Sequence, residues 1–129
     1  MVSIELEDFL QLAEAVTGLD AAALAAAPQL VARAEAALAA PFAAFGGSER
    51  YEGLALKAAV LCSRLLRNRP LPDGNARVAY VCMVELIRRN GRAWRPLAPA
   101  RECARVVERL AARELGERDF AAWVSAQIG

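Results

Sequence analysis

The stretch NRPLPDGNAR, residues 68–77, combines the groups that a phosphate-binding turn needs. Gly74 permits a tight turn and lets a ligand come close to the backbone. A helix beginning at Asn75 would leave its first amide groups without intrahelical partners, which makes an anion site. Arg77 lies in the first turn and can offer a planar guanidinium to the same anion. Asp73 can either cap the helix or hold a magnesium ion that bridges phosphate oxygens.

The same residues also have a purely structural interpretation. Asp-Gly-Asn is a common turn, Asp73 is a plausible helix cap, and Arg77 can be an ordinary surface residue. The spacing is weaker than a complete phosphate-binding loop, so by itself it favours the structural interpretation.

The elements that must position this turn are predicted to be helices. The apolar spacing predicts six helices and no strand, and therefore one compact all-α domain over residues 1–129 with short connections. The predicted helices are Glu5–Val16, Pro28–Ala39, Glu52–Arg67, Asn75–Asn90, Pro99–Leu115 and Asp119–Ile128. The run from Val78 to Val84 is apolar all round, which predicts that the helix after the turn is the central buried one.

The most irregular segment is PFAAFGGSERYEG, residues 41–53. One interpretation is a surface loop pinned by Phe42 and Phe45. The other is a flap that holds a partner or a substrate chain. The candidate flap residues are Phe45, Gly46, Gly47, Ser48, Glu49 and Arg50.

Composition narrows the function classes. The net charge of +1 argues against a dedicated nucleic-acid binder, so no direct DNA partner is expected. The chain has no histidine, and its three cysteines (Cys62, Cys82 and Cys103) lie in apolar runs without CxxC spacing, which argues against a zinc site. Buried thiols without a signal peptide predict a cytoplasmic protein, and no run is apolar enough to predict a membrane span.

The turn and its flanks resemble the Fic/Doc family, and the Doc (death-on-curing) branch in particular. The family motif reads His-x-Phe-x-Asp/Glu-Gly/Ala-Asn-Gly/Lys-Arg, and this chain has RPLPDGNAR followed by a helix that ends in RRNG. The opening segment FLQLAEAV, the region from Leu30 to Asn68 and the tail ARVVERLAARELGERDFAAWV also look like their Doc counterparts. Tyr80 stands where adenylyl transferases of the family carry a second arginine, which favours the Doc branch.

The resemblance implies a Fic/Doc-like helical bundle and a set of roles. Asp73 would hold Mg²⁺, and Gly74, Asn75, Ala76 and Arg77 would cradle the phosphates of ATP or another nucleoside triphosphate. Doc members are toxins of toxin–antitoxin pairs that act as kinases on a hydroxyl of translation elongation factor Tu. A Phd-like antitoxin neutralises them through a helical segment that folds onto the toxin in a surface groove.

Three positions depart from the family motif. Leu71 replaces the phenylalanine that anchors the loop, Ala76 replaces glycine or lysine, and Arg69 stands where the catalytic histidine belongs. A general base needs a pKa near the working pH, whereas arginine stays protonated up to a pKa above about 12. Deprotonating it near neutral pH would cost roughly 7 kcal/mol, at about 1.4 kcal/mol per pKa unit. Arg69 is therefore not expected to act as the base.

Two main hypotheses follow. In the first, the chain is a Doc-like toxin whose phosphate transfer is crippled or lost. In the second, it is a non-catalytic module that binds a nucleotide or a protein. A selected or engineered change at Arg69 is a further possibility, and Leu71 and Ala76 count against it because a single knockout would leave both unchanged.

Arginines recur at Arg101, Arg105 and Arg109 on one face of the helix predicted after Pro99. They could bind an acidic partner. Glu102 and Glu108 break up this charge, which favours a solvated face.

Overall fold

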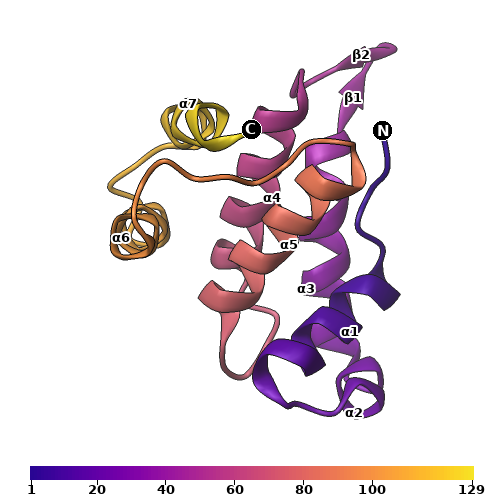
Figure 1. Ribbon diagram of the computed structural model, residues 1–129. Coiled ribbons are helices and arrows are strands. Elements are labelled where there is room, and N and C mark those ends of the chain that lie inside the picture. Colours follow the sequence, from indigo (N-terminus) through magenta and orange to yellow (C-terminus); the bar gives the residue numbers. More distant parts are fainter.

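The computed structural model describes residues 1–129 and is largely helical, with a small two-stranded hairpin (Figure 1). The elements are α1 (Leu6–Thr17), α2 (Ala21–Ala25), α3 (Pro28–Ala39), a 3-10 turn η1 (Ala40–Phe42), β1 (Ala44–Phe45), β2 (Ser48–Glu49), α4 (Leu54–Asn68), α5 (Asn75–Arg89), α6 (Ala100–Ala111) and α7 (Glu117–Gln127). None of these helices combines the length and hydrophobicity needed to cross a bilayer.

Helix α4 lies at the centre of the bundle. It packs against α3, α5 and α7, and it buries an unbroken run of seven residues, Lys57–Ser63. The prediction that the helix after the motif is buried all round is therefore wrong in part. On α5, Val78, Cys82 and Met83 are in the core, whereas Tyr80 and Val81 are only half-buried.

Seven α-helices form where six were predicted. The additional helix, α2, is only five residues long and falls in an alanine-rich connection. The carboxylate of Asp20 accepts a hydrogen bond from the amide of Ala23 at 3.0 Å, which caps this helix. The helix predicted to run to Leu115 ends at Ala111, and Arg113 then adopts a left-handed conformation with φ of 61°.

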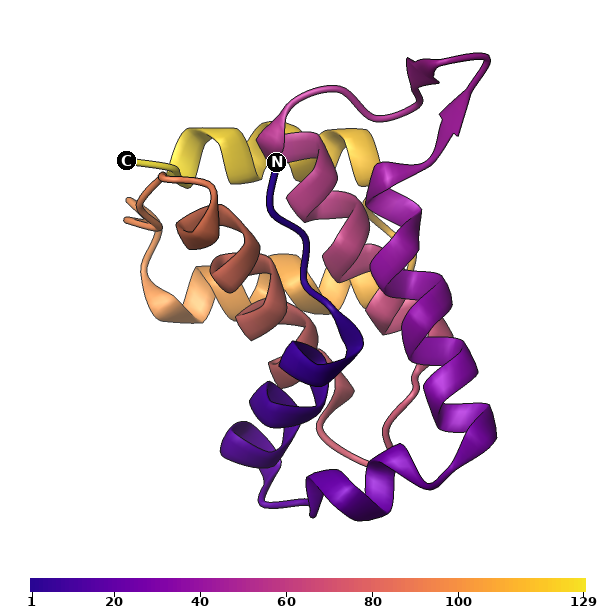
Figure 2. The same cartoon turned by 90° about the vertical axis from the view of Figure 1, so that its right-hand side faces the viewer.

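The irregular segment forms a β-hairpin, so the prediction of no strand is wrong. Ala44 pairs with Glu49 and Phe45 with Ser48 around the turn Gly46-Gly47, whose two residues both have positive φ. Glycine at both central positions suits the mirror-image turns that tight hairpins use. Phe45 is 69% exposed, so it does not pin the segment to the core. The hairpin projects beyond the helices (Figures 1 and 2).

The last helix is held onto the central one by an ion pair. Nε of Arg64 on α4 donates to Oε2 of Glu117 on α7 at 2.9 Å, and Nη2 of Arg67 lies 3.9 Å from the same oxygen. Burial by itself would raise the pKa of Glu117, but the hydrogen bond from Arg64 and the charges of both arginines outweigh it and hold that pKa below its usual value.

We predict that Glu117→Gln lowers the free energy of unfolding by about 1 kcal/mol at pH 7. A depressed carboxylate pKa contributes stability above the unfolded-state value and loses it as pH falls through the folded-state value. The difference between the variant and the unsubstituted chain should therefore be fully present above the unfolded-state pKa of about 4.3 and shrink as pH falls from there through the lowered folded-state pKa. Urea unfolding at pH 7, 5 and 3.5 measures this, with the exposed Asp119→Asn as the control. A difference that stays constant with pH would contradict the ion-pair explanation.

Candidate functional site

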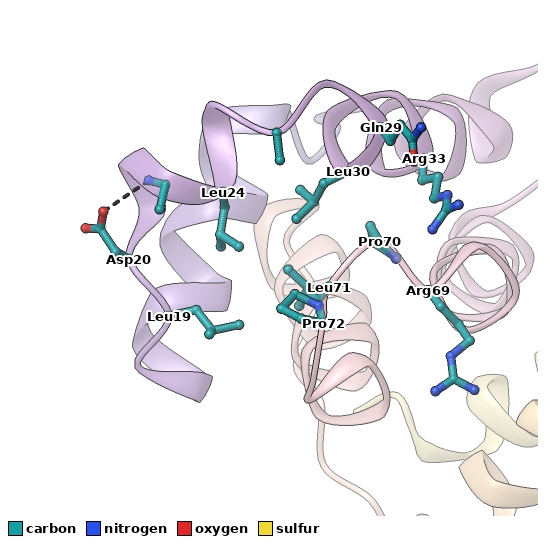
Figure 3. Close-up of a pocket in the computed structure, with 12 residues that line it drawn as sticks. Leu19, Asp20, Leu24, Gln29, Leu30, Arg33, Arg69, Pro70, Leu71 and Pro72 are labelled. Carbon is teal, nitrogen blue, oxygen red and sulfur yellow. Dashed lines mark hydrogen bonds between the residues drawn. The ribbon is translucent and has the colours of Figure 1, made fainter.

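The loop from Arg69 to Gly74 joins the two central helices, α4 and α5. Arg69 follows the last residue of α4 and adopts a left-handed conformation, with φ of 44°. This conformation is uncommon for a residue other than glycine, and asparagine, aspartate and histidine adopt it most readily. The exposed guanidinium of Arg69 extends away from Leu19 and Leu24, which line the far side of the adjoining cleft (Figure 3).

The side chain of Asn75 holds the loop closed. Its Oδ1 accepts a hydrogen bond from the backbone amide of Leu71 at 3.0 Å, and its Nδ2 donates to the carbonyl of Leu71 at 2.8 Å. The side chain of Leu71 is itself only 4% exposed and belongs to the core. The amide group of Asn75 is thus engaged within the protein, and only its backbone N–H faces outward.

Position 74 requires glycine for two reasons, its backbone conformation and the close packing around it. Its φ is +76°, and a Cβ built on it would lie 2.6 Å from Cγ2 of Thr17 at the end of α1. That separation is far inside van der Waals contact, so with a larger residue either the side chain of Thr17 or the loop must shift. The residue that approaches Gly74 closely is therefore Thr17. This contact could not be predicted from local patterns, because the two residues are 57 positions apart in the chain.

Asp73 and the start of α5 supply the polar groups of the loop. Oδ1 of the exposed Asp73 accepts from the amide of Gly74 at 2.9 Å. Gly74, not Asp73, is the N-cap residue of α5, and no side chain caps the helix. The amides of Asn75, Ala76 and Arg77 have no hydrogen-bond partner, because the first bond of the helix is from Val78 N–H to the Gly74 carbonyl. Free amides at a helix N-terminus favour an anion.

The two arginines of the motif lie on different clefts. Arg69 lines a cleft of about 520 Å³ between the loop, α2 and the start of α3. Arg77 lines a second cleft of about 590 Å³ between α1, α5 and α6, and its Nη2 donates to the carbonyl of Val16 at 3.0 Å. Of the residues predicted to cradle phosphates, Ala76 and Arg77 line the second cleft, whereas Gly74 and Asn75 line neither. Arg69, at the position of the catalytic histidine, and the predicted loop anchor Leu71 line the first cleft.

A proton acceptor that works near neutral pH is missing from the loop. The chain has no histidine, and Asp73 is the only carboxylate between Arg69 and Arg77. Cys62 and Cys82 cannot substitute, because burial raises the pKa of both thiols, that of Cys82 to about 12. No cluster of three or more histidine, cysteine or acidic side chains is placed to hold a metal ion. A cation at Asp73 would need most of its ligands from water and phosphate oxygens.

The hairpin that was predicted as a flap lies at the other end of α4. That helix has 15 residues, so about 22 Å separates its two ends. At the hairpin end, the buried amine of Lys57 donates to the carbonyl of Tyr51 and lies 3.3 Å from Oε1 of Glu49. Arg50 stacks over Phe45 and Tyr51, with its guanidinium 6.0 and 5.4 Å from the two ring centres. The candidate flap residues thus do not adjoin the motif loop.

A comparison with models of known protein families identifies the family of this chain. The model of the Fic/DOC family matches residues 4–87, which span α1 through most of α5 and include the motif loop. The chain belongs to the Fic/DOC family. This membership suggests a Fic-type transferase or a related function. No curated protein and no solved structure was found to match the chain.

We predict that Gly74→Ala destabilises the chain for two separable reasons. The left-handed backbone costs about 1 kcal/mol with a Cβ, and the contact with the Thr17 methyl adds a steric cost of about 1–3 kcal/mol. Thr17→Ser removes that methyl and keeps the hydroxyl, so it should recover the steric part only. Urea unfolding of both single variants and the double variant measures the coupling. Strictly additive effects would show that Thr17 does not limit the position of Gly74.

Proposed function

We propose that this chain is a Doc-like member of the family whose phosphate transfer is crippled or lost. Its ancestral reaction would be transfer of phosphate from a nucleoside triphosphate to a hydroxyl of translation elongation factor Tu, in the setting of a toxin–antitoxin pair. The neutralising partner would be a Phd-like antitoxin bound through a helical segment in a surface groove.

The observation that carries this proposal is the chemistry at position 69. The family motif calls for a base there, and Arg69 is permanently charged. Neither the loop nor the clefts beside it contain a histidine that could take over the role of the base. General-base help is worth about 10²–10⁴ in rate, so its loss leaves only positioning and charge stabilisation.

The remaining groups support weak phosphate binding. The carboxylate of Asp73 would hold Mg²⁺ of a bound nucleotide, and the amides of Asn75, Ala76 and Arg77 would face phosphate oxygens. When bound, such a magnesium–nucleotide complex would supply the phosphoryl group and neutralise its charge. The chain would contribute the amides and the N–H groups of Arg77 that are not bound to the carbonyl of Val16.

The alternative function is a non-catalytic binding module. This alternative is favoured because polar side chains of the motif make hydrogen bonds within the protein. Asn75 bonds to the backbone of Leu71, and Arg77 bonds to the carbonyl of Val16 on α1. Side chains that stabilise the fold in this way have a structural role that does not depend on a bound ligand. On this alternative, the clefts and surfaces serve protein partners.

We predict that Arg69→His restores activity if the site is a disabled toxin. Histidine tolerates the left-handed conformation of position 69, so the fold should survive. Expression in bacteria should then arrest growth and yield phosphorylated elongation factor Tu, with a rate gain of about 10²-fold or more. A second variant adds Leu71→Phe and Ala76→Lys. Arg118→His places a histidine on the exposed start of α7 and is the matched control. Inactivity of both loop variants would favour the binding module.

We predict that ATP with Mg²⁺ binds the unsubstituted chain, and that Asp73→Ala weakens this binding about tenfold, because the variant loses the carboxylate that would hold the metal. Isothermal titration calorimetry measures both, with Glu35→Ala on the exposed face of α3 as the control. Absence of binding, or equal binding by the Asp73 variant, would rule out the proposed magnesium–phosphate site.

A further inference from the structure

The segment that carries the hairpin, residues 44–53, has one buried side chain. Tyr51 is only 7% exposed, whereas every other residue of the segment is exposed. In Figure 1 the hairpin extends from the N-terminal end of α4, and α7 lies beside that helix. The contacts that keep the hairpin in place must therefore act largely through Tyr51.

Helix α4 binds Tyr51 at two points. The amine of Lys57 donates to the backbone carbonyl of Tyr51, and Nη2 of Arg64 donates to the hydroxyl oxygen at 2.8 Å. Lys57 and Arg64 are seven positions apart, which is about two helical turns, so both lie on the same face of α4. The tyrosine is thus held along this face by its backbone at one end and by its hydroxyl at the other. Lys57 also lies 3.3 Å from the carboxylate of Glu49 on β2.

The guanidinium that binds Tyr51 also binds the last helix. Nε of Arg64 donates to Oε2 of Glu117 at 2.9 Å, and Nη2 donates to Oε1 at 3.4 Å. Nη2 is therefore shared between the carboxylate of Glu117 and the hydroxyl of Tyr51. A guanidinium is planar and presents its N–H groups in fixed directions, so the contact with Glu117 also orients the group that reaches Tyr51.

The hairpin can move without unfolding the helices. Its two strands pair only with each other, so its displacement breaks no other strand pairing. The segment meets α4 at the exposed Gly53, where no side chain caps the helix. Release of Tyr51 and of the ion pair between Glu49 and Lys57 would free the segment as a unit.

We propose that Tyr51 is the latch of a movable hairpin and that Arg64 couples this latch to α7, so that the hairpin opens more readily once the contact between Arg64 and Glu117 is broken. Glu117 lies 66 positions after Tyr51 in the chain, and the two are linked by hydrogen bonds through Arg64. The coupling is reciprocal, as any free-energy link between two sites must be. Loss of the Tyr51 hydroxyl should therefore also loosen the start of α7.

The competing explanation is that each contact acts alone. Arg64 would then keep its bond to Tyr51 after the loss of Glu117, and the hairpin would be unaffected. Burial favours coupling, because the side chain of Arg64 is only 27% exposed and that of Glu117 only 16%. A guanidinium that loses its carboxylate partner in such a place is drawn towards water, which takes Nη2 away from Tyr51. This device depends neither on the chemistry at Arg69 nor on a bound ligand.

Hydrogen exchange of single amides, followed by NMR on the intact chain, tests the coupling. The Arg50 amide is hydrogen-bonded at the base of the hairpin, and the Phe120 amide makes the first backbone bond of α7. Glu117→Gln should speed exchange at Arg50 about fivefold, and Tyr51→Phe should speed exchange at Phe120 by a similar factor. Opening of the hairpin alone exposes little surface, so these rates should hardly change at low urea, unlike exchange through global unfolding.

Two further variants separate coupling from a general loss of stability. Leu10→Ala opens a cavity in the core at α1, which contributes no group to the network, and it is the control for global destabilisation. Arg64→Lys keeps the charge, but an ammonium group lacks the planar fork that holds both partners. It should speed exchange at Arg50, and Glu117→Gln should add nothing further in that background.

Unchanged exchange at Arg50 in Glu117→Gln, or at Phe120 in Tyr51→Phe, would overturn the proposal. So would an acceleration that Leu10→Ala reproduces at equal global stability, or a Glu117 effect that persists with lysine at position 64. Exchange of the Arg50 amide at the rate of an unprotected amide in the unsubstituted chain would show that nothing latches the hairpin, and would overturn it as well. Circular dichroism of each variant checks that the helices are intact.

Discussion

The turn between the two central helices depends on one side chain. The amide of Asn75 pairs with both backbone groups of Leu71, and Leu71 is fixed in the core. This pair of hydrogen bonds converts a stretch rich in proline and glycine into a rigid connection, so that α5 leaves the turn in one direction. The position of α5 then fixes Gly74 against Thr17 and Arg77 against the carbonyl of Val16, and with them the angle of α1.

That arrangement is consistent with the proposal that phosphate transfer is crippled or lost in this chain. Asn75 and Arg77 match the family motif, and the side chains of both also make hydrogen bonds within the fold. With Asn75 engaged in the fold, the part of the motif left for a ligand is backbone amide, one carboxylate and the N–H groups of Arg77 that are not bound to Val16. Arg69, which replaces the base, lines a different cleft from Arg77, and its guanidinium extends away from the far wall of that cleft. These structural roles support the alternative that we propose, a non-catalytic binding module.

Local patterns predicted the main helices well, since amphipathic spacing and the Pro28 and Asn75 boundaries depend on nearby residues. The hairpin was not predicted because each of its strands has only two residues, too few to show an alternating pattern. The Gly46-Gly47 pair was the one local indication of a turn. The central position of α4 could not be predicted from hydrophobicity alone. That helix contains Lys57 and Ser63, whose burial depends on partners brought close by the fold. The candidate site was predicted as a set of residues, whereas its division between two clefts depends on contacts with α1 that are distant in sequence.

The burial of Lys57 has a consequence for chemical labelling. It is the only lysine of the chain, it is 1% exposed, and its amine is held beneath the hairpin by the Tyr51 carbonyl and Glu49. The folded protein thus presents no reactive side-chain amine on its surface. An acylating reagent would reach Lys57 only when the hairpin lifts away from α4. The speed of that single modification would report how often the hairpin opens, without any added probe.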